Sequence, residues 1–270
     1  MASLICTPGR SGNHLAGLHS AGLINIHKED ISMDHAFIKR ATNITSFNLV
    51  TKDFETTKYK EEIQHIFKMH FFPNFDLADT VDSVNVQKLN SNIQKLKNEN
   101  FELFKKMHSY NLKGIGPGEV TLFFLINNAH LGGGSSGGVD LVVGSKKYEV
   151  KAVDVSPPGY ASNFKLGGTF DLSDVIAGLL DLKRRVGAGG EGVNKAALEA
   201  IRRKYPEELN VLLKKFVDRS YDNYFKDHEI IFIQNSTRNI GNILSVKKVK
   251  KEDISLDRVT SGVAKPLVRL

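Results

Sequence analysis

Hydrophobic and polar positions change their spacing along the chain, from helical periods before residue 132 to strand alternation after 139. Apolar residues three and four apart predict helices over 59–72 and 84–110, and Pro73 ends the first of these. The largely apolar stretch 119–131 predicts a buried helix that begins after a Gly-Pro-Gly turn. In the first fifty residues we expect only a short helix over 31–38 and a short strand over 46–50.

Beyond residue 138, β-branched residues predict two strands over 139–143 and 146–153. Gly144-Ser145 between them suits a two-residue hairpin turn of type II′, in which glycine stands first. Helical spacing returns over 171–186, 191–204 and 206–225, and the apolar run 229–234 predicts a strong strand with a partner over 240–249. The glycine-rich segment 132–138 is either a flexible linker or a loop that borders a site. These elements predict an α/β protein.

Composition narrows the class of protein but does not choose a function. Hydrophobic residues make up 41% and charged residues 25%, as in ordinary globular domains, so collagen, coiled coil and general disorder are excluded. The chain has no run of 18 apolar residues, and its first residues lack the order of a secretory signal. One cysteine, Cys6, cannot form an internal disulfide. We therefore expect a cytoplasmic protein, or a virion-associated one if it comes from a phage, without a membrane partner.

The charge is unevenly distributed, which points weakly to a polyanionic partner. The formal net charge is +7. Residues 1–110 hold 13 Lys or Arg and 12 Asp or Glu, whereas residues 111–270 hold 24 and 18. A basic second half is compatible with nucleic acid, although many soluble proteins are equally basic.

The predicted hairpin gathers the residues with the most specific chemistry. A two-residue turn at Gly144-Ser145 pairs Asp140 with Glu149, and directly opposed residues share one face of a sheet. Lys151 lies two residues beyond Glu149 and therefore on the same face. Opposed carboxylates repel, so a divalent cation such as Mg²⁺ would stabilise the pair. The alternative is an exposed charged face in which Lys151 simply forms a salt bridge with either carboxylate.

The order of parts favours the first interpretation. A helix that begins at Glu119 precedes the strand of Asp140, then the strand of Glu149-Val150-Lys151, a helix and a strong apolar strand. This order, with Asp140 nine residues before a Glu-x-Lys string, resembles the PD-(D/E)xK nuclease superfamily, which includes many restriction endonucleases. The resemblance covers roughly residues 113–235. Valine, not proline, precedes Asp140.

The resemblance implies a fold and a set of roles. The fold would be α/β, a restriction-endonuclease-like core with a mixed central sheet flanked by helices. Asp140 and Glu149 would hold one Mg²⁺ together with the backbone carbonyl of Val150, with Mn²⁺ as a substitute, and Glu119 would either orient a metal-bound water or bind a second metal ion. The metal would activate a water, and Lys151 would position or help to deprotonate it and stabilise the transition state. Glu119 is otherwise only a first-turn acid that suits the helix dipole.

The resemblance also divides the chain. We expect a mostly helical N-terminal extension over 1–112, the nuclease-like core over 113–250 and a tail over 251–270. Nucleic-acid contacts are assigned to Lys165 and to the basic run Lys183, Arg184 and Arg185, each of which is otherwise a solvated surface group.

The leading hypothesis is a Mg²⁺-dependent DNA endonuclease that acts as a homo-oligomer or within a larger assembly. A second hypothesis keeps the fold without catalysis, as a DNA-binding or structural component of a phage particle or transposition complex. A third is an unrelated α/β binding domain in which the Glu-x-Lys string is a coincidence.

Overall fold

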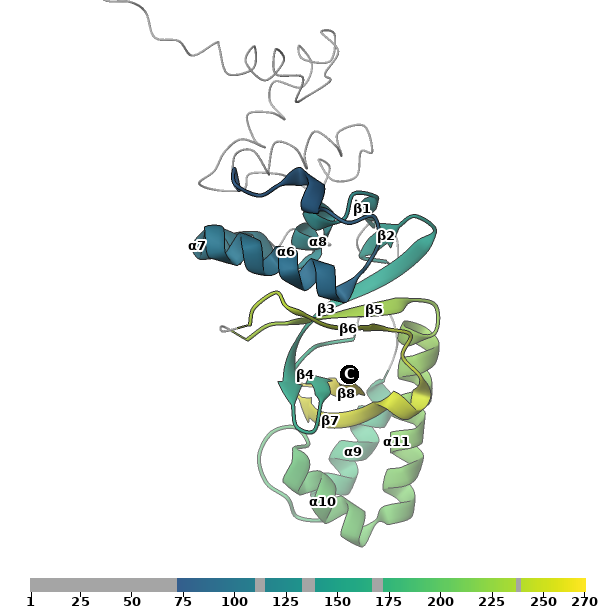
Figure 1. Ribbon diagram of the computed structural model, residues 1–270. Coiled ribbons are helices and arrows are strands. Elements are labelled where there is room, and N and C mark those ends of the chain that lie inside the picture. Colours follow the sequence, from purple (N-terminus) through teal and green to yellow (C-terminus); the bar gives the residue numbers. More distant parts are fainter. Residues whose placement is uncertain (1–71, 110–114, 133–138, 167–171, 237–238) are drawn as a thin grey trace, which may run out of the picture. The chain divides into compact units, whose positions relative to one another are not determined.

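A computed structural model describes residues 72–109, 115–132, 139–166, 172–236 and 239–270 (Figure 1). The chain divides into two units, Met1–Leu77 and Ala78–Leu270, and the described part of the first is 72–77. The elements expected over 31–38, 46–50 and most of 59–72 lie outside the described residues, as does Cys6.

The second unit is mixed α/β, with helices on either side of a sheet. Its helices are α6 (Val86–Glu99), α7 (Phe101–His108), α8 (Glu119–Leu125), α9 (Ser173–Arg185), α10 (Lys195–Lys204) and α11 (Pro206–Ser220). Short helical turns lie at η2 (Leu77–Asp79), η4 (Tyr221–Phe225) and η5 (Lys251–Asp253). Its strands are β1 (Ala129–Leu131), β2 (Leu141–Val143), β3 (Lys146–Ser156), β4 (Tyr160–Ser162), β5 (Glu229–Gln234), β6 (Ile243–Lys247), β7 (Ile254–Thr260) and β8 (Val263–Arg269).

The long strand β3 joins two parts of the sheet. Its first half lies between β2, which is antiparallel to it, and β5, which is parallel, with β1 and β6 outside them. Its last three residues pair with β4, which leads on to β8 and β7, all antiparallel. The sheet is therefore mixed, as expected for the fold class at this coarse level.

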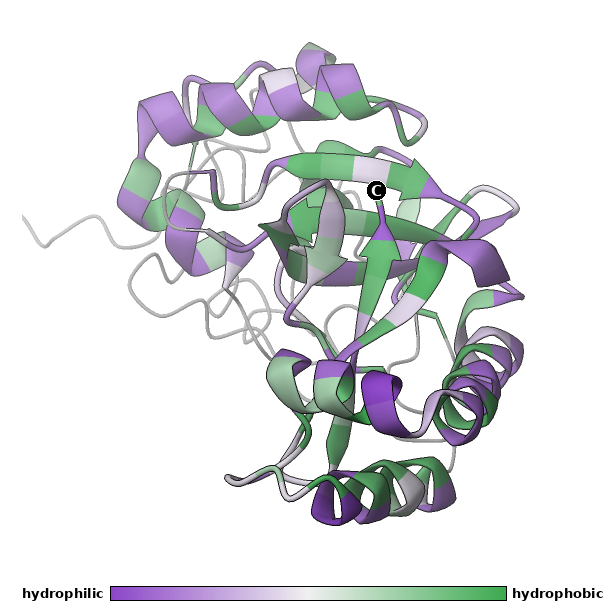
Figure 2. Ribbon diagram, turned by 90° about the horizontal axis from the view of Figure 1, so that it is seen from below, coloured by the Kyte–Doolittle hydropathy of each residue, from purple (hydrophilic) through white to green (hydrophobic). Residues whose placement is uncertain are grey.

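The strands form the apolar middle of the unit, and the helices turn their polar faces outward (Figure 2). Strand β5 is the clearest case, because Ile230, Ile231, Phe232 and Ile233 are all buried. A strand buried on both faces reads as a continuous apolar run, which is why the sequence predicts it so well. One core cluster joins Val153 of β3 and Phe232 of β5 to residues of α9, α10, α11, β7 and β8. Helices α6 and α8 pack near β6 and β1.

Two predicted helices are interrupted. The helix expected over 84–110 is two helices, because the Asn100 side chain accepts a hydrogen bond from Leu103 N at 3.0 Å and caps α7. Helix α8 ends at Leu125 rather than continuing to 131, and the chain enters β1 at Ala129. Helices α6 and α7, assigned by sequence to the N-terminal extension, belong to the same unit as the sheet.

The expectation of a tail over 251–270 is wrong in its secondary structure. These residues form η5 and the hairpin β7–β8, which turns at Ser261-Gly262 with positive φ at both positions. That backbone is typical of a type I′ turn, which matches the twist of the flanking strands. No helix in the described ranges combines the length and the apolar character needed to cross a membrane.

Candidate metal and phosphate site on β2 and β3

The hairpin β2–β3 has the predicted register. Val143 pairs with Lys146 and Leu141 pairs with Tyr148 across the two-residue turn. Gly144 has φ +59°, whereas Ser145 is not among the residues with positive φ, which is the pattern of a type II′ turn. Turn chemistry and strand alternation therefore place Glu149 and Lys151 as the sequence predicts.

Asp140 departs from the predicted ladder. Strand β2 begins at Leu141, and the backbone N–H of Asp140 donates to the carbonyl oxygen of Tyr148 at 3.1 Å. The Asp140 carboxylate takes the place of a backbone acceptor, because its Oδ2 accepts the Val150 N–H at 2.9 Å. The direct Asp140–Glu149 pair is therefore not part of the ladder. A side-chain bond to the backbone of β3 still fixes Asp140 beside that strand.

Lys151 lies between the two carboxylates. Its Nζ is 2.9 Å from Glu149 Oε1 and 3.5 Å from Asp140 Oδ2. The side chains of Asp140, Glu149 and Lys151 are between 12% and 20% exposed. They are therefore mostly buried, and solvent reaches only a small part of each. We call Glu119, Asp140, Glu149 and Lys151 the carboxylate cluster.

The pKa values reflect this setting. Burial raises the pKa of Asp140, and the Glu149 charge adds to the rise, while the Lys151 ammonium opposes it. Burial by itself lowers the pKa of Lys151, but Tyr224, Asp140 and Glu149 outweigh it and raise the value overall. Lys151 is therefore an ammonium at neutral pH.

Glu119 is the first residue of α8 and is buried at the edge of the cluster. Its Oε1 accepts the Gly116 N–H at 2.5 Å. Its Oε2 is also buried, and no described residue donates a hydrogen bond to it. Burial and the charge of Asp140 raise the pKa of Glu119 to about 9. At neutral pH this side chain is a neutral acid with one unsatisfied oxygen.

Gly118 sets the start of α8 through its backbone. It is the N-cap, with φ +89°, a conformation that favours glycine. A Cβ at this position would lie 2.7 Å from Ile233 Cδ1, so a larger residue here would require the Ile233 side chain to move. The turn that the sequence predicts before Glu119 is thus also a close packing contact.

Tyr224 completes the cluster, and sequence reasoning missed it. Its Oη donates to Glu149 Oε1 at 2.6 Å, and Lys151 Nζ lies 5.5 Å from the centre of its ring. Tyr224 belongs to η4, a π-helical turn that follows α11. Helical spacing over 206–225 predicts an ordinary helix and gives no sign of this turn, although such turns are frequent at functional sites.

The donor set fits a hard divalent cation in its chemistry. Carboxylate oxygens are the ligands that Mg²⁺ favours, and the cluster holds three carboxyl groups against one ammonium. The unsatisfied Glu119 Oε2 is consistent with a missing ligand. Among the described residues, however, no three His, Cys, Asp or Glu side chains are grouped so that they could hold a metal ion. In this structure the cation that contacts both Asp140 and Glu149 is the Lys151 ammonium. Val150 contributes a buried side chain and the N–H that binds Asp140.

Each cation of the basic run at the end of α9 has a partner within the chain. Lys183 is buried, and its Nζ donates to the carbonyl oxygen of Gly190. Arg185 binds the Glu208 carboxylate at 2.5 and 2.9 Å. Arg184 is exposed and pairs with Asp181 at 3.2 Å. The local structure therefore engages these cations, and a nucleic-acid contact by Lys183, Arg184 or Arg185 stays a prediction.

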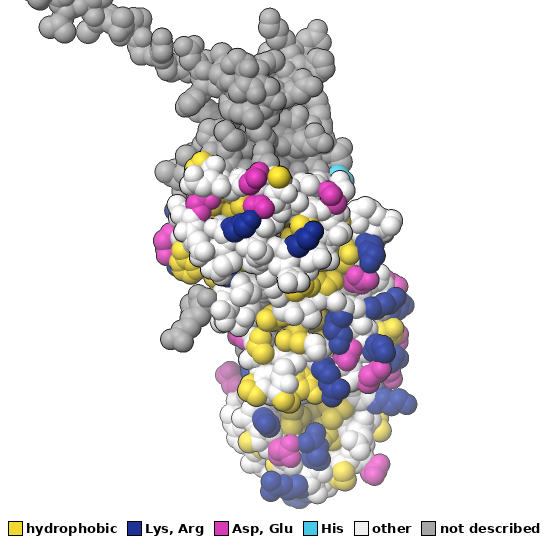
Figure 3. All heavy atoms as spheres, viewed as in Figure 1, with side chains coloured by type: hydrophobic (Ala, Val, Ile, Leu, Met, Phe, Trp, Pro, Cys, Tyr) yellow, Lys and Arg dark blue, Asp and Glu magenta, His cyan; other side chains and the backbone are white. Residues whose placement is uncertain are grey.

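The surface around these helices shows the same mixture of charges. On the face drawn in Figure 3, Lys and Arg side chains follow the part of the unit that holds α9, α10 and α11, with Asp and Glu among them. Ion pairs join Arg202 to Glu199 at 2.7 Å and Lys251 to Asp218 at 2.7 Å. Lys165 differs, since it is exposed and forms no ion pair with a carboxylate of the described residues.

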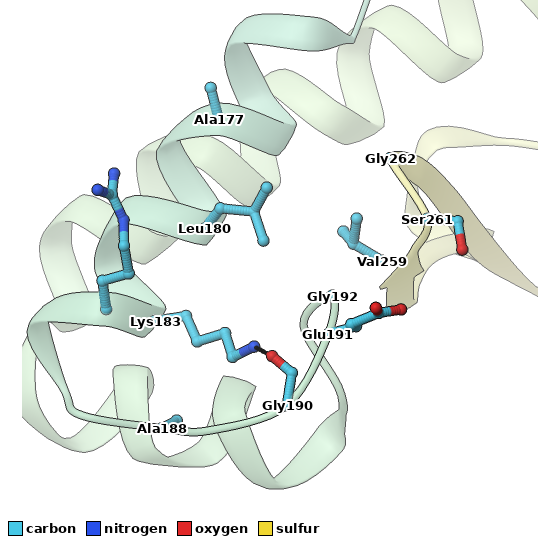
Figure 4. A pocket seen from close by; sticks show the side chains of 11 residues that line it. Ala177, Leu180, Lys183, Ala188, Gly190, Glu191, Gly192, Val259, Ser261 and Gly262 are labelled. Atoms are coloured by element: carbon cyan, nitrogen blue, oxygen red, sulfur yellow. Dashed lines mark hydrogen bonds between the residues drawn. The ribbon is translucent and has the colours of Figure 1, made fainter.

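A hollow of about 880 Å³ lies away from the carboxylate cluster (Figure 4). Leu180 and Lys183 of α9, the glycine loop at Gly190 and the β7–β8 turn at Ser261 line it. In this hollow the Lys183 side chain extends to the Gly190 carbonyl, which holds the loop against α9 (Figure 4). None of the cluster residues lines it, so this hollow is separate from the candidate site.

Comparison of the chain with protein-family models, with curated proteins and with solved structures found no match.

Proposed function

We propose that the carboxylate cluster is the active site of a Mg²⁺-dependent nuclease that hydrolyses phosphodiester bonds in DNA. The observation that carries the proposal is the meeting of Asp140, Glu149 and Lys151 on one hairpin, with Lys151 2.9 Å from Glu149. The order of elements supports it, because β3 lies between an antiparallel β2 and a parallel β5, after the helix of Glu119. This is the order for which the sequence resembles the PD-(D/E)xK superfamily, so we extend the proposal to a restriction-endonuclease-like fold.

Asp140 and Glu149 would hold the cation, and Glu119 would bind or orient a water beside it. A bound Mg²⁺ would polarise the scissile phosphate and lower the pKa of a water molecule. Asp140 is fixed for this role by the Val150 N–H, and Glu149 by the Tyr224 hydroxyl. Val150 in β3 and Tyr224 in η4 therefore orient the two carboxylates that would bind the metal.

Lys151 would act chiefly as a cation. Its pKa is raised by Tyr224, Asp140 and Glu149 against the effect of burial, so it keeps its proton at neutral pH. An ammonium in this position stabilises negative charge that develops on phosphate oxygens. The Lys151 ammonium can donate a hydrogen bond to the attacking water. It cannot accept a proton from that water while it is charged, so another base would have to do so.

A test compares cleavage of supercoiled plasmid, linear duplex, single-stranded and branched DNA in Mg²⁺, in Mn²⁺ and in EDTA. We expect cleavage in either metal and none in EDTA. Asp140→Asn and Lys151→Met should each lower the rate by at least about 10²-fold, the effect of removing one preorganised charge from such a site. Glu229→Gln is the matched control, since Glu229 is a half-exposed carboxylate on neighbouring β5 that pairs with Lys146.

One observation favours the second candidate function, a catalytically silent nuclease-like protein that binds DNA or supports an assembly. The Lys151–Glu149 ion pair satisfies the charge of Glu149 without a metal. A parent protein that binds DNA but cuts none of the four substrates in either metal would decide for this candidate.

A further inference from the structure

The hollow between α9, the loop 186–192 and the β7–β8 turn has the size of a small-molecule site (Figure 4). Its volume is about 880 Å³, and pockets that bind small ligands commonly enclose about 300–1,000 Å³. Such pockets are mostly apolar, with a few polar groups that fix the ligand. Here Leu180 of α9 and Val259 of β7 face each other across the space, and Ala177 and Ala188 add further apolar surface. We call it the α9 hollow.

Lys183 brings a buried charge into the α9 hollow. It is only 6% exposed, and its side chain extends into the hollow, where Nζ donates to the carbonyl oxygen of Gly190 (Figure 4). That bond uses one of the three N–H groups of the ammonium. In the part of the chain that the structure describes, no carboxylate forms an ion pair with Lys183. Because a buried charge without a counter-ion is costly, a bound anion would stabilise this side chain.

The loop beside Lys183 has backbone donors without acceptors. The N–H groups of Gly187 and Ala188 donate to carbonyl oxygens at the end of α9. The four N–H groups of 189–192 have no hydrogen-bond acceptor among the described residues. The backbone φ is positive at Gly187, Gly190 and Gly192, and successive N–H groups in such turns form concavities that bind anions. The loop therefore offers further donors to the anion that Lys183 favours.

Contacts on both sides hold this loop in place. Val193 and Val259 exchange two backbone hydrogen bonds of 2.9 Å, which tie the end of the loop to β7. Gly192 passes so close to β7 that a Cβ would overlap the carbonyl oxygen of Val259. On the other side, Lys183 ties Gly190 to α9. The α9 hollow is therefore preformed between two fixed elements.

Donors outnumber acceptors on the lining of the hollow. Arg184 is exposed at the rim and pairs with Asp181 at 3.2 Å. Glu191, the one carboxylate among the described residues of the lining, is exposed and lies on the side of the β7–β8 turn (Figure 4). The buried end of the hollow thus combines the Lys183 ammonium with free N–H groups, so an acid group fits there better than a cation.

We propose that the α9 hollow binds a small organic acid, a phosphomonoester or a carboxylate, that carries an apolar body. The acid group would bind the Lys183 ammonium and the N–H groups of 189–192, and the apolar body would lie between Leu180 and Val259. None of the residues of the carboxylate cluster lines the hollow. Binding there is therefore separate from the proposed nuclease activity, and either can fail without the other.

Isothermal titration calorimetry of the full chain in EDTA, with phenyl phosphate and phenylacetate in separate titrations, measures binding and identifies the acid group. We expect at least one of the two to bind, with one molecule per chain. Inorganic phosphate and benzyl alcohol each carry only half of the proposed ligand, so both should bind more weakly. Lys183→Met should lower the affinity by at least about tenfold, because a hydrogen bond to a charged group is lost. Lys204→Met removes the same charge from an exposed position in α10 and should have little effect.

Ala177→Leu fills the hollow while Lys183 stays intact. Ala177 is exposed on α9 and lines the hollow, and leucine is a good helix former, so the fold should be kept. The organic acid should then no longer bind, whereas Ala196→Leu, at an exposed position of α10, should bind it like the parent. Circular dichroism melting curves check the fold of each variant.

Binding of neither organic acid by the parent would overturn the proposal. So would an affinity for inorganic phosphate or benzyl alcohol equal to that for the organic acid, since either would remove half of the ligand's chemistry. An unchanged affinity in Lys183→Met, or equal affinities in Ala177→Leu and Ala196→Leu, would place the bound acid outside the α9 hollow and contradict the proposal as well.

Discussion

The carboxylate cluster and the basic run at the end of α9 both hold charged groups against apolar packing, but they neutralise them differently. Lys183 is buried with a backbone carbonyl as its acceptor, and Arg185 has its own carboxylate in Glu208. Each cation of the run thus has a local partner. In the cluster one ammonium, Lys151, serves Asp140 and Glu149 together, while Glu119 keeps an oxygen without a donor. Unbalanced charge, rather than the number of charges, therefore marks the candidate site.

Lys151→Met removes the one positive charge of the carboxylate cluster and should have the largest effect on stability. Two carboxylates then remain partly buried without a cation, and we expect unfolding free energy to fall by about 3 kcal/mol at pH 8 without metal. Chemical denaturation monitored by circular dichroism measures the change. Stability should recover with Mg²⁺, and also as the pH falls and the carboxylates take up protons. A loss that neither treatment reverses would show that the packing of the lysine side chain matters more than its charge.

Glu119→Gln tests whether Glu119 is protonated in the folded protein at neutral pH. The pKa of Glu119 in the folded protein is about 9, against an ordinary value of 4.5. The folded state therefore binds an extra proton between these limits, and its stability falls as the pH rises through that window. The variant lacks this dependence, so its stability relative to the parent should increase by about 2.7 kcal/mol between pH 6 and pH 8.

Urea unfolding at several pH values measures this difference, and Glu102→Gln, an exposed carboxylate of α7, serves as the control. Parallel pH profiles for the parent and Glu119→Gln would contradict the assignment of a protonated Glu119. Saturating Mg²⁺ should flatten the difference, because a nearby cation favours the ionised acid.

Tyr224→Phe removes the phenol and leaves the ring over Lys151. Loss of a hydrogen bond to a charged acceptor should lower the unfolding free energy by about 1.5 kcal/mol. The proposed cleavage should also require more Mg²⁺ for half-maximal rate, because Glu149 loses the group that orients it. A metal titration of the rate measures this, with Tyr221→Phe in the same turn as control. An unchanged metal requirement would limit Tyr224 to packing.

Lys183→Met should have the smallest effect and completes the comparison with Lys151→Met. The methionine keeps much of the buried side-chain volume and loses the hydrogen bond to Gly190, at a cost of about 1 kcal/mol. Neither Mg²⁺ nor pH should reverse this loss, and affinity for duplex DNA in EDTA should not change. A clear drop in DNA affinity would instead support the predicted nucleic-acid contact of Lys183.

The sequence predicts those parts of the site that depend on neighbouring residues. The register of β2–β3 follows from strand alternation and the Gly144-Ser145 turn, both of which are local. The position of Asp140 is only half predicted, because its carboxylate replaces a backbone acceptor and the ladder ends one residue early. Tyr224 could not be predicted, since it reaches Glu149 from 75 residues away through the packing of α11 and its π-helical turn.

The C-terminal hairpin β7–β8 was not predicted, although the sequence contains a turn signal for it. Ser261-Gly262 is a turn dipeptide between two alternating runs, but Pro266 and the many charges argue against a strand. Pro266 has no backbone N–H to donate. It lies opposite Leu256, beside the irregularity in the β7–β8 register before Arg258. On the other side of β8, strand β4 pairs only with Val268 and Arg269, so Pro266 lies outside that ladder.

Mn²⁺ binding followed by electron paramagnetic resonance tests most directly whether the carboxylate cluster takes a divalent cation. We predict that the parent binds one Mn²⁺ per chain in competition with Mg²⁺, that Asp140→Asn abolishes this binding and that Glu229→Gln preserves it. Absence of bound Mn²⁺ in the parent, or binding that Asp140→Asn leaves unchanged, would contradict a metal site on β2 and β3.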